Sequence, residues 1–380
     1  YGAQDIYLTG NPQITFFKVV YRRHTNFSME SIQQTFNGSA DFGGDVSATI
    51  SRNGDLVYRM YLEHTCKFTA SGAGGDHVQL CERYGDSLIK ECEIEIGGQK
   101  IDKHTSMWNR VWSDLTEFNP SGHFGCTRGA LVPGDVSNAN TGNGTLYQLM
   151  TGNGYGLNSE QVETRNNFGH ATGDDNNSTV NGFLYTQNRD SPARSAAINT
   201  NTINIPLNFW FNRNPGLALP LIALQYHEVK VKMTFESVDN LVRRFVSADA
   251  DLDTGDTFKF DGNKGTSAAT VTSPTFNLWC DYIYLDTDER RRFAQVSHEY
   301  LIEQLQYSDN TISSASPSID LNFNHPVKEL IWTTRNETAG DDKGRNQPLI
   351  TATGDPTASP VSLDTMGGNW QLKLNGHDRF

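Results

Sequence analysis

The sequence predicts an all-β protein built from two consecutive β-sandwiches, the second of which is incomplete. Short apolar runs alternate with polar residues at a period of two, as expected for strands with one buried face. Turns rich in glycine and asparagine separate these runs, and long polar segments interrupt them. The order of strands and turns then recurs after residue 298, which indicates an internal duplication rather than a solenoid.

Length and composition favour two loop-rich globular domains. A chain of 380 residues is long for one hydrophobic core. Its 36% hydrophobic content and 34 glycines exclude a disordered chain and a coiled coil. The formal net charge of -13 argues against direct nucleic-acid binding on a broad basic surface, and it suits a protein that stays soluble at high concentration.

The cysteines and the hydropathy pattern exclude further classes of site. Five cysteines are present, an odd number without a CxxC pair, so we expect reduced thiols rather than zinc ligands or a disulfide framework. No stretch approaches the roughly 20 apolar residues of a membrane span. We therefore expect no metal or other cofactor and no insertion into a membrane.

The first sandwich is predicted to follow a surface arm. Residues 1–25 hold a turn at Gly10-Asn11-Pro12 and then an apolar run, and the proline bars a regular strand ladder at its position. Residues 26–36 form a first strand. Alternating apolar residues at 46–50 and 58–62 flank Asn53-Gly54-Asp55, a pattern that predicts a β-hairpin.

A strand with a carboxylate face precedes the predicted helix. Glu91, Glu93 and Glu95 alternate with apolar residues and share one face. Such carboxylates suit metal binding or acid–base chemistry, but a charged face toward solvent or another subunit is the favoured interpretation. Residues 104–118 then place Trp108, Trp112 and two aliphatic residues on one side of a helix that Pro120 ends.

Two long polar insertions are expected in the first sandwich, which spans residues 26–286. They cover about 119–201 and 239–272 and are too long for ordinary connections. The first carries N-glycosylation sequons at Asn143, Asn176 and Asn177. Between and after the insertions, strands are predicted at 203–211, 229–235 and 276–285, and one or two helical turns at 214–225.

The linker between the two sandwiches is predicted at residues 287–297, within a dense charged run. Arg290, Arg291 and Arg292 suggest a phosphate or DNA site, but the acidic residues just before them offset their charge. Paired ions at a domain junction are therefore favoured. We expect these arginines to hold the two sandwiches, or a neighbouring subunit, in place.

Residues 298–380 repeat the beginning of the first sandwich. Strands are predicted at 299–307, 319–323, 327–334 and 370–374, with a turn at Asn375-Gly376. Four strands are half of a sandwich and would leave its inner face wet. We therefore expect this unit to be truncated, the chain being a fragment of a longer protein, or else a partner to supply the missing half.

Four segments also resemble one protein family. They are YGAQDIYLTGNPQITFFKVVYRRHTNF (1–27), YLDTDERRRFAQVSHEYLIEQLQ (284–306), HPVKELIW (325–332) and LNGHDRF (374–380). The sequence is similar here to the major capsid proteins of nucleocytoplasmic large DNA viruses, in particular those of phycodnaviruses and mimivirus-like viruses. The resemblance covers the arm, the junction and the visible part of the second unit.

The resemblance implies a double jelly roll and a structural role in the virion. Family members form homotrimers, which act as pseudo-hexagonal capsomers of an icosahedral shell around an internal membrane. It implies neighbouring capsomers, penton and minor capsid proteins as partners, and assembly in the host-cell cytoplasm. The long insertions would face outward or contact neighbouring subunits, and asparagines of family members can carry glycans on that outer face.

An enzymatic role is not expected. The sequence contains no Walker loop, GxSxG or HExxH motif and no HxH pair of the cupin type. The alternative that remains is a carbohydrate-binding or hydrolytic β-sandwich, because a glycosidase needs two suitably spaced carboxylates and acidic residues are plentiful.

Overall fold

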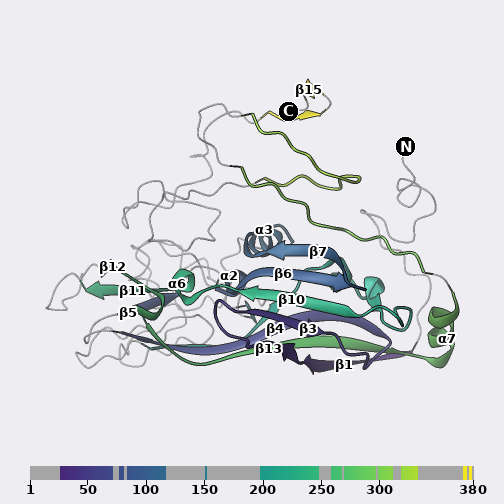
Figure 1. The fold of residues 1–380 in the computed structure, drawn as a ribbon, viewed down its shortest axis with the longest axis horizontal. Helices are drawn as coiled ribbons and strands as arrows, with labels where there is room; N and C mark the ends of the chain where they lie inside the picture. Colours follow the sequence, from purple (N-terminus) through teal and green to yellow (C-terminus); the bar gives the residue numbers. More distant parts are fainter. Residues whose placement is uncertain are drawn as a thin grey trace, which may run out of the picture.

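The structure is a computed structural model of the chain. It describes residues 26–71, 77–80, 84–116, 150–151, 197–247, 258–267, 269–296, 298–310, 318–332, 371–374 and 376–378. Within these residues the fold is dominated by antiparallel strands, which confirms the all-β class (Figure 1). No helix in these ranges is long and apolar enough to cross a membrane.

Two packed sheets form the first unit. Sheet one has the order β1 (Phe27–Gln34), β13 (Ala269–Leu285), β4 (Leu56–Ala70) and β8 (Ala197–Pro206), with β9 (Leu219–Pro220) also paired to β4. Sheet two has the order β2 (Phe36–Asn37), β3 (Asp45–Thr49), β10 (Val229–Phe235), β6 (Ile89–Ile96) and β7 (Gln99–Thr105).

The strand order of these sheets is that of a jelly roll. Without the two-residue strands β2 and β9, the two sheets contain β1, β3, β4, β6, β7, β8, β10 and β13. Numbered from 1 to 8 along the chain, these strands have the order 1-8-3-6 in sheet one and 2-7-4-5 in sheet two. The first of the two expected jelly rolls is therefore complete.

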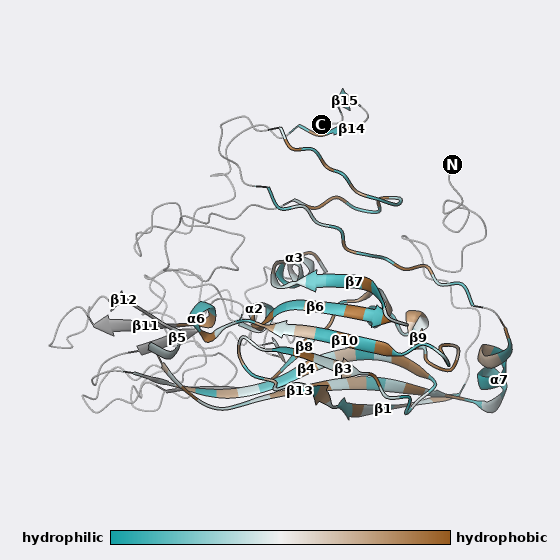
Figure 2. Ribbon diagram, viewed as in Figure 1, coloured by the Kyte–Doolittle hydropathy of each residue, from teal (hydrophilic) through white to brown (hydrophobic). Residues whose placement is uncertain are grey.

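The core lies between the two sheets. Sheet one contributes Leu62, Phe68 and Leu278, and sheet two contributes Ile94 and Val231, each fully buried. Burial of one such side chain contributes about 1.5–3 kcal/mol. Apolar and polar residues alternate along these strands, visible as changes of colour along β13 in Figure 2.

Smaller elements complete the first unit. A third sheet has the order β12 (Phe258–Lys264), β11 (Val242–Ser247) and β5 (His77–Leu80). The α-helices are α2 (Tyr84–Leu88), α3 (Ser106–Thr116), α6 (Val238–Leu241) and α7 (Thr287–Gln295). The 3-10 turns are η3 (Trp210–Asn212), η4 (Pro215–Leu217) and η5 (Gly265–Ser267).

The predicted hairpin at residues 46–62 is wrong. β3 pairs with β2 and β10 in sheet two, whereas β4 pairs with β13, β8 and β9 in sheet one. The turn crosses between the sheets: the Ile50 amide donates to Val229 of sheet two, and the Asp55 amide donates to Ile283 of sheet one. The strands on both sides of such a corner turn one face to the same core. Apolar and polar residues therefore alternate along them as they do in a hairpin.

Other elements follow the sequence prediction with shifted ends. The predicted helix is α3, and the turn expected after residue 214 is η4. The strand predicted at 203–211 ends at Pro206, because Trp210–Asn212 form a 3-10 turn. The predicted insertion at 239–272 contains β11 and β12 and the beginning of β13, so much of it is sheet.

The described part of the second unit is extended but has little regular sheet. The described residues of the strands predicted at 299–307, 319–323 and 327–334 form no ladder. They approach through Gln306, whose side chain bonds the backbone amide and carbonyl of Asn324 at 2.9 and 3.1 Å. β14 (Lys373–Leu374) and β15 (His377–Asp378) flank the predicted turn. A β-strand forms only when its backbone groups bond to those of a neighbouring strand. Alternation of apolar and polar residues does not show whether such a neighbour is present.

Candidate assembly surfaces and the junction between units

The charged run after β13 forms helix α7 rather than an open linker. Asp286 caps it by accepting a hydrogen bond from the Thr287 amide at 2.7 Å. Acidic residues occupy the first turn and Arg292 the last, in the order that the helix dipole favours. The charge pattern that marked the linker is therefore that of a short, capped surface helix.

Arg290 holds α7 against the first jelly roll. Its Nε and Nη2 atoms lie 3.0 Å from Oδ1 and Oδ2 of Asp55, in the turn between β3 and β4. The Asp55 side chain is 9% exposed and also accepts from the Leu285 amide at 2.8 Å. Hydrogen bonding to Asp55 raises the pKa of Arg290. Arg291 and Arg292 are exposed and form no ion pair within the described part of the chain.

A second ion cluster, which sequence reasoning missed, joins the two units directly. Nη1 of Arg213, just after η3, lies 2.6 Å from Oε2 of Glu303, and Nζ of Lys328 lies 2.8 Å from Oε1 of the same carboxylate. The Arg213 guanidinium also lies 4.0 Å above the Trp112 ring of α3. Burial lowers the pKa of Arg213, and Glu303 opposes that shift.

Residues 300–305, which we call the strap, cover the edge of sheet two beside β7. The Tyr300 hydroxyl donates to the Ala218 carbonyl. The Gln304 side chain donates to the Ile101 carbonyl at 2.5 Å, and the Leu305 amide donates to Asp102 Oδ1 at 3.0 Å. An uncovered edge strand is a template for unwanted pairing. The strap therefore protects β7 while it positions the second unit (Figure 1).

The buried polar groups beneath the strap are structural. Asp102 Oδ2 lies 2.9 Å from Nε2 of His104, without the alignment of a good hydrogen bond, and the His104 ring stacks on Phe209. Both side chains are at most 3% exposed. The described cysteines, Cys66, Cys92 and Cys280, are buried, and no disulfide joins one of them to another.

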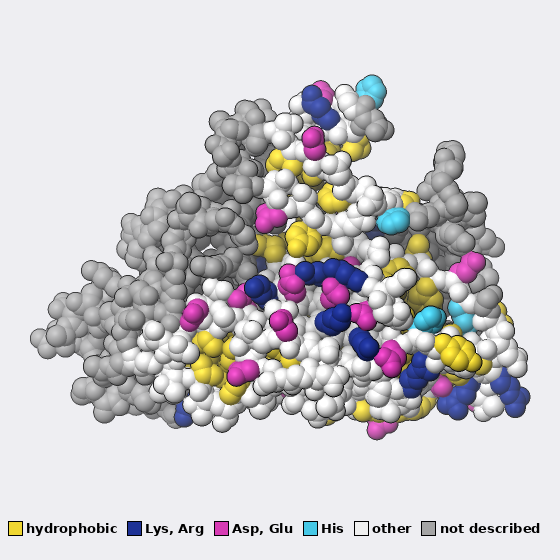
Figure 3. All heavy atoms as spheres, viewed as in Figure 1, with side chains coloured by type: hydrophobic (Ala, Val, Ile, Leu, Met, Phe, Trp, Pro, Cys, Tyr) yellow, Lys and Arg dark blue, Asp and Glu magenta, His cyan; other side chains and the backbone are white. Residues whose placement is uncertain are grey.

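The outer face of sheet two is a lattice of paired charges. The predicted glutamates are paired across strands: Glu91 with Lys103 at 2.7 Å, Glu93 with Lys100 at 3.1 Å, and Glu95 with Lys232 at 2.5 Å. Figure 3 shows basic and acidic side chains interspersed near the middle of the visible face. Glu91, Glu93, Lys103 and Lys232 border a groove of about 370 Å³. No cluster of three potential metal ligands was found among the described residues.

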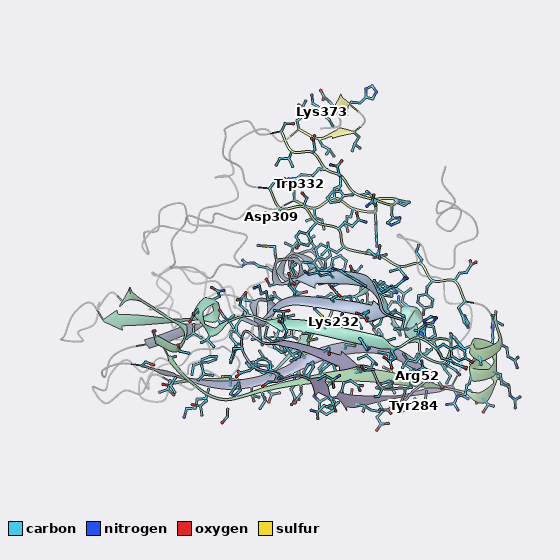
Figure 4. The ribbon with its side chains drawn as sticks, viewed as in Figure 1. Arg52, Lys232, Tyr284, Asp309, Trp332 and Lys373 are labelled. Atoms are coloured by element: carbon cyan, nitrogen blue, oxygen red, sulfur yellow. The ribbon has the colours of Figure 1, made fainter. Side chains whose placement is uncertain are left out.

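The outer face of sheet one has a different character. Some of its side chains are linked by neutral hydrogen bonds, such as Gln33 to Asn277 at 3.0 Å and Thr65 to Thr275 at 2.6 Å. Two carboxylates, those of Glu63 and Asp281, also accept hydrogen bonds on this face. Figure 4 places Lys232 on β10, in the other sheet of the sandwich from β1. The predicted sequons Asn143, Asn176 and Asn177 lie outside the described residues.

Comparison with known proteins assigns the chain to a family. A family model described as "Major capsid protein N-terminus" matches residues 15–286, and one described as "Large eukaryotic DNA virus major capsid protein" matches 289–380. The major capsid protein of Pyramimonas orientalis virus is 44% identical over 380 residues, which cover 100% of this chain and 70% of the relative. That of Paramecium bursaria Chlorella virus 1 is 40% identical, with 100% and 72% covered.

The chain spans only part of the length of other relatives. The match to the major capsid protein of Phaeocystis pouchetii virus, 44% identical, covers 88% of this chain and 57% of that protein. A quasi-atomic model of the PBCV-1 capsid aligns with a TM-score of 0.49 and 36% identity over 82% of this chain and 57% of that chain. From the family models and these identities, the chain belongs to the family of major capsid proteins of large eukaryotic DNA viruses.

Proposed function

We propose that this chain is a structural subunit that forms homotrimers, the pseudo-hexagonal capsomers of an icosahedral shell. The observation that carries the proposal is a complete jelly roll followed by a second unit that Arg213 and the strap hold in a defined place. Two jelly rolls in each of three chains present six similar modules around a threefold axis. Such a ring suits the near-hexagonal tiling of a closed shell.

The proposed division of the chain is an arm at 1–25, a first jelly roll at 26–286, a linker at 287–297 and a second jelly roll from 298. The family models, which meet between residues 286 and 289, support it. We also propose that Arg291 and Arg292 contact the second unit or a neighbouring subunit, because both are exposed on α7. Asn143, Asn176 and Asn177 are proposed glycan acceptors on the outer loops.

The proposed partners are neighbouring capsomers, penton proteins and minor capsid proteins, with assembly in the host cytoplasm. The inner viral membrane would lie nearby without insertion of this chain, and direct binding of nucleic acid is not part of the role. The net charge of -13 supports the last point. We propose no catalytic activity: the carboxylates singled out in the sequence are each engaged by a lysine.

Light scattering coupled to size-exclusion chromatography tests the proposal. The expected species has three times the mass of the chain, and negative-stain micrographs should show near-hexagonal particles. A strictly monomeric species at all concentrations would overturn it. Turnover in a glycoside-hydrolase panel would instead favour the hydrolytic alternative.

A further inference from the structure

An asparagine that precedes a glycine can lose its side-chain amide without an enzyme. The glycine backbone nitrogen attacks Cγ of the asparagine side chain, ammonia leaves, and the two residues close a succinimide ring. Glycine favours this step because it has no Cβ and its backbone rotates freely. Water then opens the ring at one of its two carbonyls. The product is aspartate, or isoaspartate, in which the main chain runs through the former side chain.

Two Asn-Gly pairs lie wholly within the described residues, at 37–38 and 53–54. Both asparagines are exposed, so water reaches each of them. The glycine nitrogen must rotate toward Cγ before it attacks, and a backbone held by its neighbours resists that rotation. The rate of reaction at each pair therefore depends on how readily the fold opens there.

The corner between β3 and β4 holds the pair at 53–54 in place. The Asn53 side-chain nitrogen donates to Ser51 Oγ at 2.9 Å, and the Tyr282 hydroxyl donates to the Ser51 carbonyl at 2.6 Å. A Cβ on Gly54 would lie 2.8 Å from the Tyr282 side chain, so the turn is packed closely against sheet one. Opening of this corner would disrupt these contacts together, which protects Asn53.

The pair at 37–38 lies at the end of a two-residue edge strand. Among the described strands, β2 pairs with β3 alone. The Asn37 side chain forms no hydrogen bond in the described part of the chain. Gly38 has a φ of 108°, a conformation that glycine adopts readily, and the chain leaves the sheet there. Few contacts oppose local opening, so the Gly38 nitrogen can approach Cγ of Asn37.

We propose that Asn37 is a site of spontaneous deamidation whose products alter the edge of sheet two. The inference does not depend on the proposed function. Strand pairing aligns Asn37 with Ser47 of β3, and Ser47 with Lys232 of β10. An aspartate at position 37 would therefore add a carboxylate to the charged outer face of this sheet.

Isoaspartate would have a larger effect, because it adds one methylene to the backbone within β2. The added atom would shift the pairing of Phe36 with Ala48 and of Asn37 with Ser47. Phe36 packs edge-on against Phe235 of the core, with ring centroids 6.3 Å apart. Formation of isoaspartate should therefore loosen β2 and the neighbouring part of β3.

Peptide mapping of the full chain tests the proposal. The purified chain is aged at mildly alkaline pH, and mass spectrometry follows the conversion of amide to acid at each pair. Enzymatic methylation of isoaspartate identifies the second product. In the folded chain Asn37 should react about tenfold faster than Asn53 or more. In urea, where the fold no longer distinguishes the pairs, their rates should become about equal.

Hydrogen exchange of residues 36–49 provides a second readout. It should become faster as the unmodified chain ages and stay constant in Asn37→Gln, because glutamine would have to close a larger ring that forms more slowly. Asn53→Gln is the matched control and should age as the unmodified chain does. Equal rates at the two pairs in the folded chain, or a faster rate at Asn53, would overturn the proposal.

Two further outcomes would also contradict it. A preference for Asn37 that persists in urea would mean that the neighbouring residues, and not the fold, set the rate. Modification of Asn37 without faster exchange at residues 36–49 would show that the edge of sheet two tolerates both products unchanged.

Discussion

At the scale of single residues, Arg213 links the first jelly roll to Glu303 of the second unit. Its guanidinium lies between the Trp112 ring and the Glu303 carboxylate, and its side chain is 22% exposed. Arg213→Met keeps much of the packing but leaves Glu303 without its more buried partner. We expect a loss of about 1–3 kcal/mol in the free energy of unfolding, measured by urea denaturation. Protease cleavage near residue 303 should also become faster.

Lys328→Met provides the control for Arg213. Lys328 contacts the same carboxylate but is 36% exposed, so the loss should be about 1 kcal/mol or less. Equal losses from the two variants would show that Arg213 is an ordinary surface ion-pair member and not the main link between the units.

His64 is expected to make the first jelly roll sensitive to acid. Its Nδ1 donates to the Thr275 carbonyl at 2.8 Å, and its Nε2 accepts from the Tyr84 hydroxyl at 2.8 Å. Burial lowers the pKa of His64 to about 4, below its value of 6.5 in an unfolded chain. Between these values the unfolded chain binds the extra proton, so stability falls as the pH falls. The contribution lost from pH 7 to pH 5 is about 2 kcal/mol.

His64→Gln removes the titration while it retains a donor and an acceptor. The variant should be less stable than the unmodified chain at pH 7, and the difference should shrink by about 2 kcal/mol at pH 5. Chemical denaturation at both pH values measures this. A difference that does not change with pH would mean that His64 is not held neutral by the fold.

At the scale of elements, α7 depends on its contact with Asp55. Asp55→Asn keeps the shape of the side chain but removes the charge that two Arg290 nitrogens and the Leu285 amide engage. Hydrogen exchange of residues 287–295 should become faster, because the helix is short and few other contacts hold it. Mass spectrometry of the exchanged peptides measures this directly.

Changing Arg291 and Arg292 together to Gln is the matched control for α7. Both are exposed, so exchange of the helix in the isolated chain should remain as before. A loss of trimer yield in this double variant would support their proposed role toward another unit. Faster exchange instead would mean that they stabilise the helix itself.

Sequence patterns predict single elements better than their partners. The alternation at 229–235 and the apolar side of α3 both predict the observed element, because each reports which side of a segment is buried. The same alternation at 46–62 does not tell a hairpin from a corner between sheets. The two differ in the partners of the strands, β10 for β3 and β13 for β4, which the local sequence does not reveal. At the corner, a Cβ on Gly54 would lie 2.8 Å from the Tyr282 side chain.

The candidate site was predictable to a similar degree. The glutamates at 91, 93 and 95 were correctly placed on one strand face, but their lysine partners depend on the register of three strands. The charged run is a short helix, and Arg290 pairs with Asp55 of the first jelly roll, a partner that the local sequence does not reveal. Arg213 and Glu303 are 90 residues apart, and no local pattern connects them.

At the scale of the whole molecule, one part of the chain supplies the core of the first jelly roll, and the strap packs against it from outside. Every buried residue of its main core lies between Val46 and Tyr282, and Tyr300 of the strap packs against that core. Burial raises the pKa of the Tyr300 hydroxyl, as expected for a side chain fixed in the protein. Core and edge protection are thus supplied by different parts of the chain.

This separation predicts how two shortened chains will differ. A chain of residues 26–310 retains the core and the strap, whereas one of 26–296 retains the core but leaves the β7 edge uncovered and Arg213 without Glu303. Both should show strand-rich circular dichroism. The shorter chain should melt several degrees lower, since about 1 kcal/mol corresponds to roughly 2–4 °C in a domain of this size. It should also aggregate faster through the open edge of β7. Equal melting temperatures and equal solubility would show that the strap only connects the units and protects nothing.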